Sequence, residues 1–83
     1  MKYIEMTGSP KSANFSTKAA FLTQLRVFGF EQAKMRKKDN KVDILCTDDP
    51  HSSTLKMQLA VELNVEIMTY EEMAENFELE GDL

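Results

Sequence analysis

The sequence contains one cysteine, no tryptophan, two prolines and three glycines. A single cysteine excludes an internal disulfide, and a small domain without disulfides suits a reducing compartment. No apolar run approaches the ~20 residues that span a bilayer, and the N-terminus lacks the basic-then-apolar pattern of a secretory signal. We therefore expect a cytoplasmic protein, or a nuclear one if the source is eukaryotic, with no membrane partner.

Side chains that commonly carry catalysis are scarce or unfavourably placed. His51 is the only histidine, so a Ser-His-Asp or Cys-His arrangement would have to use it. It stands near Asp48 and Asp49, but a metal site usually needs three or four ligands in fixed geometry, and a solvated loop is the simpler interpretation. Cys46 lies in an apolar stretch, where a thiol usually only packs. We expect no enzyme activity, no metal and no cofactor.

Charge is divided unevenly along the 83 residues. Residues 1–41 carry nine Lys and Arg against three Asp and Glu, whereas residues 42–83 carry one lysine against eleven acidic residues. This imbalance fits a basic face that approaches nucleic acid, and it fits two ordinary solvated faces equally well. The basic residues that could contact a DNA backbone are Lys11, Lys34, Arg36, Lys37, Lys38 and Lys41. No aromatic side chain is interleaved among the last five to stack on bases, so such contacts would not read sequence.

Hydrophobic periodicity predicts alternating strands and helices. Strands are expected at 2–6, 31–35, 42–47 and 65–68, and helices from Asn14 or Ser16 to Gly29, from about Ser53 to Asn64, and from Thr69 to Phe77. This β-α-β-β-α-β-α order predicts an α/β fold with a small four-stranded, mostly parallel sheet flanked by about three helices. Residues 1–77 would form the single domain, and residues 78–83 a frayed acidic tail.

The expected core follows from the helical stripes. The residues placed in it are Phe21, Leu25, Phe28, Leu55, Met57, Leu59, Ala60, Leu63, Tyr70, Met73, Ala74 and Phe77. Gly29 is expected to end the first helix in the left-handed region, and Thr69 with Glu72 has the spacing of a capping box.

Two short segments are candidates for binding an anion. Thr7 and Gly8 follow the first strand, at the carboxyl edge where open α/β sheets tend to bind ligands. The hydroxyl can donate to an anion, and a glycine lets a ligand approach its backbone N–H closely. Thr54 and Lys56 lie at the start of the second long helix, where the helix dipole favours negative charge. Both segments also have a plain structural interpretation. Thr7 and Gly8 can be an ordinary turn, and Lys56 can be a solvated lysine that counters Asp48 and Asp49.

Taken in order, these features resemble a BRCT domain. The resemblance covers roughly residues 2 to 77 and rests on four segments: Thr7-Gly8, Gly29 closing the first helix, Val42–Thr47 followed by Ser53–Lys56, and Leu59–Met68. It implies that Thr7, Gly8 and Lys56 bind phosphate, with Thr54 supporting Lys56. The family's usual tryptophan in the last helix is absent, and Met73 is expected to fill that space.

The resemblance implies a binding module of DNA repair or replication. The single copy and short loops are similar to the BRCT domains of NAD-dependent DNA ligases and replication factor C large subunits, which points toward DNA or a 5′-phosphate. A phosphorylated protein is the other partner that the family suggests. The alternative is a phosphate-independent scaffold or homodimer that docks through an apolar face.

Overall fold

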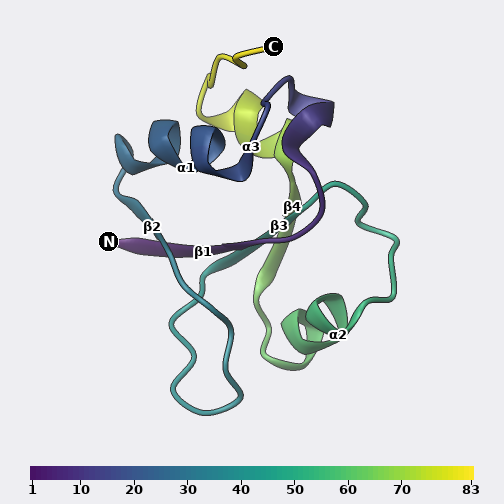
Figure 1. The fold of residues 1–83 in the computed structure, drawn as a ribbon. Coiled ribbons are helices and arrows are strands. Elements are labelled where there is room, and N and C mark those ends of the chain that lie inside the picture. The colour runs from purple at the N-terminus through teal and green to yellow at the C-terminus, as the bar shows by residue number, and fades with distance from the viewer.

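The computed structural model describes residues 1–83, which form four strands, three α-helices and one short 3-10 helix (Figure 1). In chain order the elements are β1 (Lys2–Met6), η1 (Pro10–Ala13), α1 (Lys18–Arg26), β2 (Phe30–Gln32), β3 (Ile44–Thr47), α2 (Leu55–Glu62), β4 (Glu66–Thr69) and α3 (Tyr70–Asn76). The predicted α/β class is confirmed, including the order of its strands and α-helices along the chain. The sequence indicated only a turn where η1 forms; Pro10 begins it and the Ser9 side chain caps it.

The four strands form one sheet in the order β2-β1-β3-β4, and every neighbouring pair is parallel. β1 and β3 are therefore the central strands, with Ile4 opposite Ile44 and Met6 opposite Cys46. All four residues of β3 are buried, as expected of a central strand covered on both faces. Because the strands are parallel, the ends of β1 and β3 lie side by side, and the Thr7 N–H donates to the Cys46 carbonyl at 2.9 Å.

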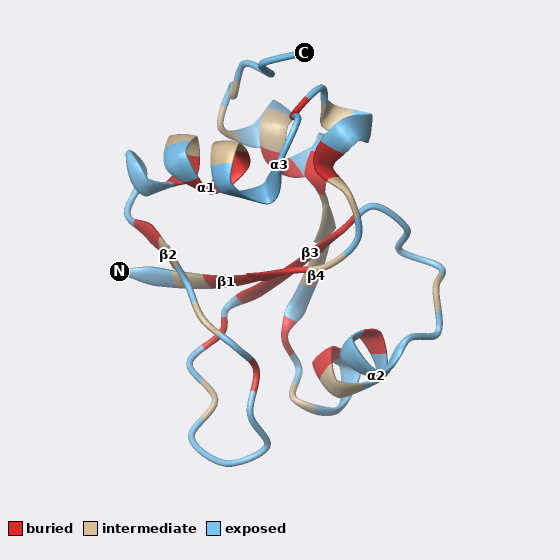
Figure 2. Ribbon diagram, in the orientation of Figure 1, coloured by how far each residue is buried: buried red, intermediate tan, exposed pale blue.

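The helices cover both faces of this sheet. α1 and α3 lie on one face and α2 lies on the other (Figures 1 and 2). The core beneath α1 and α3 contains Ile4, Met6, Phe15, Phe21, Leu22, Leu25, Phe30, Ile44, Cys46, Tyr70 and Met73. The smaller core beneath α2 contains Met35, Val42, Leu45, Met57, Ala60 and Val65. Leu45 faces α2 while its neighbours in β3 face α1 and α3, because successive side chains of a strand alternate between faces.

The helix ends follow local rules that the sequence carries. The α3 capping box is confirmed, with the Thr69 side chain and Glu72 bonded to each other's backbone N–H groups. Gly29 has φ +86°, the left-handed conformation predicted for it. α1 is instead capped by Thr17, one residue after Ser16, because the Thr17 hydroxyl accepts from the Ala20 N–H. No helix combines the length and apolar character that crossing a membrane requires.

Two residues expected in the core are exposed. Phe28 is 51% exposed because α1 ends at Arg26, so the helical stripe does not extend to it; its ring packs on Phe77 instead, with centroids 5.2 Å apart. Leu55 is 83% exposed because α2 buries Met57 and Ala60, which turns its first residue toward solvent. Leu59, Leu63, Ala74 and Phe77 are half-buried, whereas the remaining expected core residues are buried.

The C-terminal residues also differ from the expectation of a frayed tail. The Leu79 N–H donates to the Ala74 carbonyl at 2.8 Å, and the Leu79 side chain packs against the larger core. The Asp82 carboxylate accepts from the Ser16 N–H at 2.7 Å and from the Ser16 hydroxyl. Residues 79–83 are thus docked beside the start of α1.

The second strand was also predicted too long, since β2 is Phe30–Gln32 and the chain leaves the sheet at Ala33.

Candidate functional site

The segment after β1 presents two polar groups without a partner in the protein. The Thr7 backbone is held on both sides, because its N–H donates to Cys46 and its carbonyl accepts from the Tyr70 hydroxyl at 2.9 Å. The Thr7 hydroxyl and the Gly8 N–H make no hydrogen bond. We call Thr7, Gly8 and Ser9 the β1 corner. Its hydroxyl and amide lie at the carboxyl edge of the sheet, where the sequence predicts an anion site.

The β1 corner already has an anion beside it. Asp48, the first residue after β3, accepts from the Ser9 N–H at 2.8 Å. A Cβ atom built on Gly8 would collide with this carboxylate, and the φ of Gly8 is +74°. The left-handed backbone favours glycine here, and the Asp48 carboxylate fills the space that a side chain at this position would need.

Lys56 lies on the α2 side of the sheet, where its ammonium is paired with Glu5. The Lys56 Nζ is 3.1 Å from one carboxylate oxygen of Glu5, and the side chains are 49% and 8% exposed. Glu5 and Thr7 are alternate residues of one extended segment, so they face the same side about 7 Å apart along it. Lys56 thus pairs with a carboxylate two residues before Thr7 and makes no hydrogen bond or ion pair with Thr7 or Gly8, so the convergence of these three residues on a phosphate stays a prediction.

Thr54 supports α2 rather than the Lys56 side chain. Its hydroxyl caps the helix by accepting from the Met57 N–H at 3.4 Å. It makes no hydrogen bond to Lys56. Its role in the site is to fix where the helix begins and hence where Lys56 projects.

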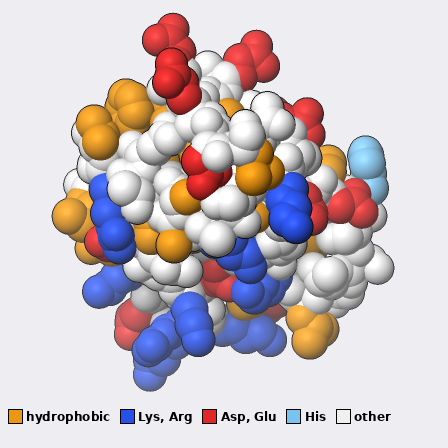
Figure 3. Space-filling view, turned by 45° about the horizontal axis from the view of Figure 1, so that its top comes forward, with side chains coloured by type: hydrophobic (Ala, Val, Ile, Leu, Met, Phe, Trp, Pro, Cys, Tyr) orange, Lys and Arg blue, Asp and Glu red, His pale blue; other side chains and the backbone are white.

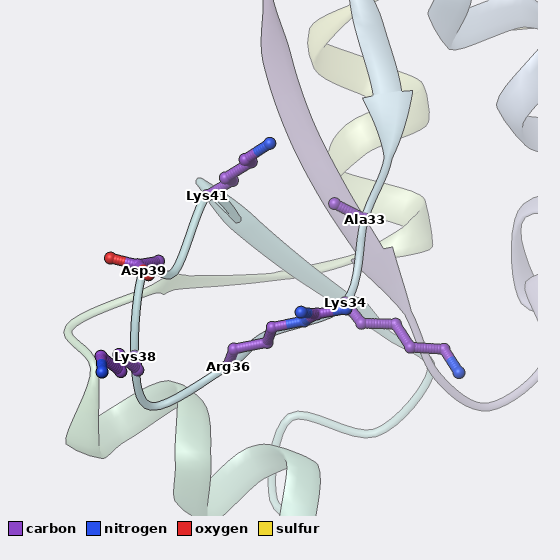
Figure 4. A pocket seen from close by; sticks show the side chains of 6 residues that line it. All are labelled: Ala33, Lys34, Arg36, Lys38, Asp39 and Lys41. Atoms are coloured by element: carbon purple, nitrogen blue, oxygen red, sulfur yellow. The ribbon is translucent and has the colours of Figure 1, made fainter.

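The densest positive charge lies in the connection between β2 and β3, residues 33–43, which we call the basic loop. It borders an open cavity of about 390 Å³ lined by Ala33, Lys34, Arg36, Lys38, Asp39 and Lys41 (Figure 4). Four basic residues and one acidic residue thus line the cavity, and no aromatic ring does. In Figure 4 the side chains of Lys34, Lys38 and Asp39 extend away from the space inside the loop. Lys37 points elsewhere, with its Nζ 3.9 Å from Glu62 in an exposed pair. Figure 3 shows most of the visible Lys and Arg side chains in the lower half of the molecule, whereas acidic side chains stand at the top, at the right edge and among the basic ones.

The basic loop is anchored at both ends, although it contains no helix or strand. At its start, the Ala33 N–H donates to the Ile4 carbonyl at 3.0 Å. Met35 and Val42 are buried in the core beneath α2. Near its end, the Asn40 amide group donates to the Val42 carbonyl and accepts from its N–H, both at 3.2 Å. The cations therefore project from a backbone that is fixed on either side of them.

Glu5 joins the basic loop to α2. One of its carboxylate oxygens accepts from the Met35 N–H at 2.6 Å, and the other binds Lys56. Sequence reasoning missed Glu5 because a glutamate in an alternating strand usually faces solvent. The sequence predicts one buried face for this strand, whereas in the structure β1 is a central strand whose Glu5 side is covered as well.

Lys11 is separated from the other predicted DNA contacts. It lies in η1, which packs against α3, whereas the basic loop passes over the face of the sheet that α2 covers (Figure 1).

Cys46 and His51 are also apart from the cavity. Cys46 is fully buried, and burial raises the pKa of its thiol far above the usual range, so it packs as an inert side chain. His51 is exposed, and no group of three or more His, Cys, Asp or Glu side chains could hold a metal ion.

Comparison of the chain with protein-family models, with curated proteins and with solved structures finds no significant match.

Proposed function

We propose that this chain is a BRCT-type binding module of DNA repair or replication that engages DNA through backbone phosphates. The observation that carries the proposal is the concentration of charge on the basic loop, where Lys34, Arg36, Lys38 and Lys41 lie within a few residues of one another around a cavity of about 390 Å³ with Asp39 as the single acidic lining residue. Ammonium and guanidinium groups are the usual partners of nucleic-acid phosphates. The lack of an aromatic lining predicts binding that does not depend on base sequence.

The position of the basic loop beside β1 extends this proposal to a phosphate at a DNA end. Met35 and Lys56 both bind Glu5, so the loop and the N-terminal turn of α2 meet over the strand that leads to the β1 corner. A duplex held by the basic loop could present a terminal phosphate to the Thr7 hydroxyl and the Gly8 N–H. A phosphorylated protein would bind the same Thr7 and Gly8 donors, but it would bring fewer phosphates than DNA to the cations of the basic loop. We therefore favour DNA.

The test is the binding of a labelled 20-base-pair duplex, followed by fluorescence anisotropy at low salt. The double variant Lys34→Ala/Arg36→Ala should weaken binding about tenfold or more, since two phosphate contacts are lost. The matched control Lys2→Ala/Lys18→Ala removes the same charge from the start of β1 and from α1, outside the cavity, and should change the affinity less than about threefold. Equal losses in the two variants, or no binding by the wild type, would refute the proposal.

A phosphate-independent scaffold is the second candidate, favoured by one surface feature. Val27 and Phe28, adjacent at the end of α1, are 82% and 51% exposed. Exposed apolar groups that are contiguous mark protein interfaces more often than isolated ones do. Light scattering distinguishes this candidate, because self-association that persists in high salt and disappears in Phe28→Ser would favour it over DNA binding.

A further inference from the structure

We infer that Asp48 determines whether the β1 corner accepts a phosphate group, because its carboxylate already occupies the space beside the corner's free donors. The inference rests on the proposed function, since it concerns a phosphate bound at the same surface. It assigns a role to a residue outside the sequence-based site, which comprised Thr7, Gly8, Lys56 and Thr54.

The geometry gives Asp48 the contacts of an internal anionic ligand. Its carboxylate accepts from the Ser9 N–H at 2.8 Å and lies against Gly8, where no Cβ atom would fit. The Gly8 N–H and the Thr7 hydroxyl stay free next to it. A phosphate that binds these two groups has one of its oxygens in, or next to, the position of the Asp48 carboxylate.

Electrostatic repulsion then disfavours the presence of both the Asp48 carboxylate and a phosphate at the β1 corner. A carboxylate and a phosphate in contact repel each other, and the nearest cation of α2, Lys56, is already paired with Glu5. This repulsion weakens phosphate binding by about tenfold or more unless Asp48 moves away. Asp48 is exposed, so its side chain has room to turn toward solvent. The β1 corner therefore does not bind anions that interact with it weakly. It binds a phosphate group whose ligand is also held by the basic loop.

The adjacent Asp49 supplies a matched control. It has the same charge and is also exposed, but its carboxylate accepts from the His51 N–H at 2.9 Å and does not touch the β1 corner. Asp48→Asn and Asp49→Asn thus change the net charge equally. Asp48→Ala removes the occupant altogether, which covers the case in which an asparagine amide keeps the bond to Ser9.

The experiment is a titration with inorganic phosphate, followed through the backbone amide signals of Gly8 and Ser9 by NMR. We expect Asp48→Asn or Asp48→Ala to bind phosphate at these amides about tenfold more tightly than the wild type, and Asp49→Asn to stay within about twofold of it. The inference is overturned if neither Asp48 variant binds more tightly, or if Asp49→Asn gains as much. Binding of a duplex without terminal phosphates to the basic loop does not involve Asp48, so failure here and failure of the proposed function are separate results.

Discussion

Glu5 links the basic loop to α2 through its contacts with Met35 and Lys56. Replacing it should lower the free energy of unfolding by an amount that depends on the replacement. Glu5→Ala removes the acceptor of the Met35 N–H, a buried hydrogen bond of 2.6 Å. Leaving a buried donor without a partner costs about 1–3 kcal/mol. The same variant releases Lys56, whose half-exposed ion pair contributes about 1 kcal/mol or less because the ammonium rehydrates. With the side-chain packing that is also lost, we expect a decrease of about 2–4 kcal/mol in the free energy of unfolding.

Glu5→Gln separates the two contributions. An amide oxygen still accepts from Met35, so this variant loses mainly the ion pair and should be less stable by only about 1 kcal/mol. A double-mutant cycle with Lys56→Met then measures the coupling between Glu5 and Lys56 directly. For a domain of 83 residues, whose total stability is on the order of 5–10 kcal/mol, the alanine variant should be clearly destabilised.

The assay is chemical denaturation of Glu5→Ala, Glu5→Gln, Lys56→Met and the double variant of the cycle, together with hydrogen exchange of the Met35 amide. We expect faster exchange at this amide in Glu5→Ala than in Glu5→Gln. The reasoning fails if Glu5→Ala changes stability by less than about 0.5 kcal/mol, since a buried unpaired N–H cannot cost so little. Equal stability of the Ala and Gln variants would show that the Met35 bond contributes nothing.

Two further predictions concern the segments next to the site. Tyr70→Phe removes the bond from the phenol to the Thr7 carbonyl at 2.9 Å and should lower the free energy of unfolding by about 1–2 kcal/mol in denaturant melts. Tyr3→Phe, whose hydroxyl makes no hydrogen bond, should change it by less than about 0.5 kcal/mol, and similar losses in both variants would contradict the role of this bond. Hydrogen bonds from the Ser16 hydroxyl and N–H hold the pKa of Asp82 below its ordinary range. The ionised carboxylate therefore stabilises the docked tail at pH values above the unfolded-state pKa. This stabilisation is lost as the pH falls through the lower folded-state pKa, and the tail is released. The Ser16 amide signal should therefore titrate below the ordinary Asp range and lose this transition in Asp82→Asn, and a midpoint in the ordinary Asp range or above would refute the tail contact.

Features set by short sequence patterns were predictable. The span of β1, the burial of Cys46 in β3, the capping box at Thr69 and the left-handed Gly29 all depend on neighbours within a few residues. The parallel sheet followed from the alternation of strands and helices, because crossovers between parallel strands need room for a helix. The position of Thr7 and Gly8 at the sheet edge followed from the same reasoning.

Features set by contacts between distant segments were not predictable. The burial of Glu5 depends on Met35 and Lys56, which are 30 and 51 positions away along the sequence. The approach of Asp48 to Gly8 depends on the register between β1 and β3. The docking of Asp82 on Ser16 spans 66 positions. In each case a polar side chain appears free in the sequence and finds its partner only in the folded chain.

The salt dependence of duplex binding tests the central claim most directly, because each neutralised phosphate releases counterions. If the four cations of the basic-loop cavity contact DNA, the logarithm of the binding constant should fall with the logarithm of salt concentration with a slope of about −3 to −4. Lys34→Ala/Arg36→Ala should make that slope shallower by about 2 units. A slope near zero in the wild type, or an unchanged slope in this variant, would contradict the account.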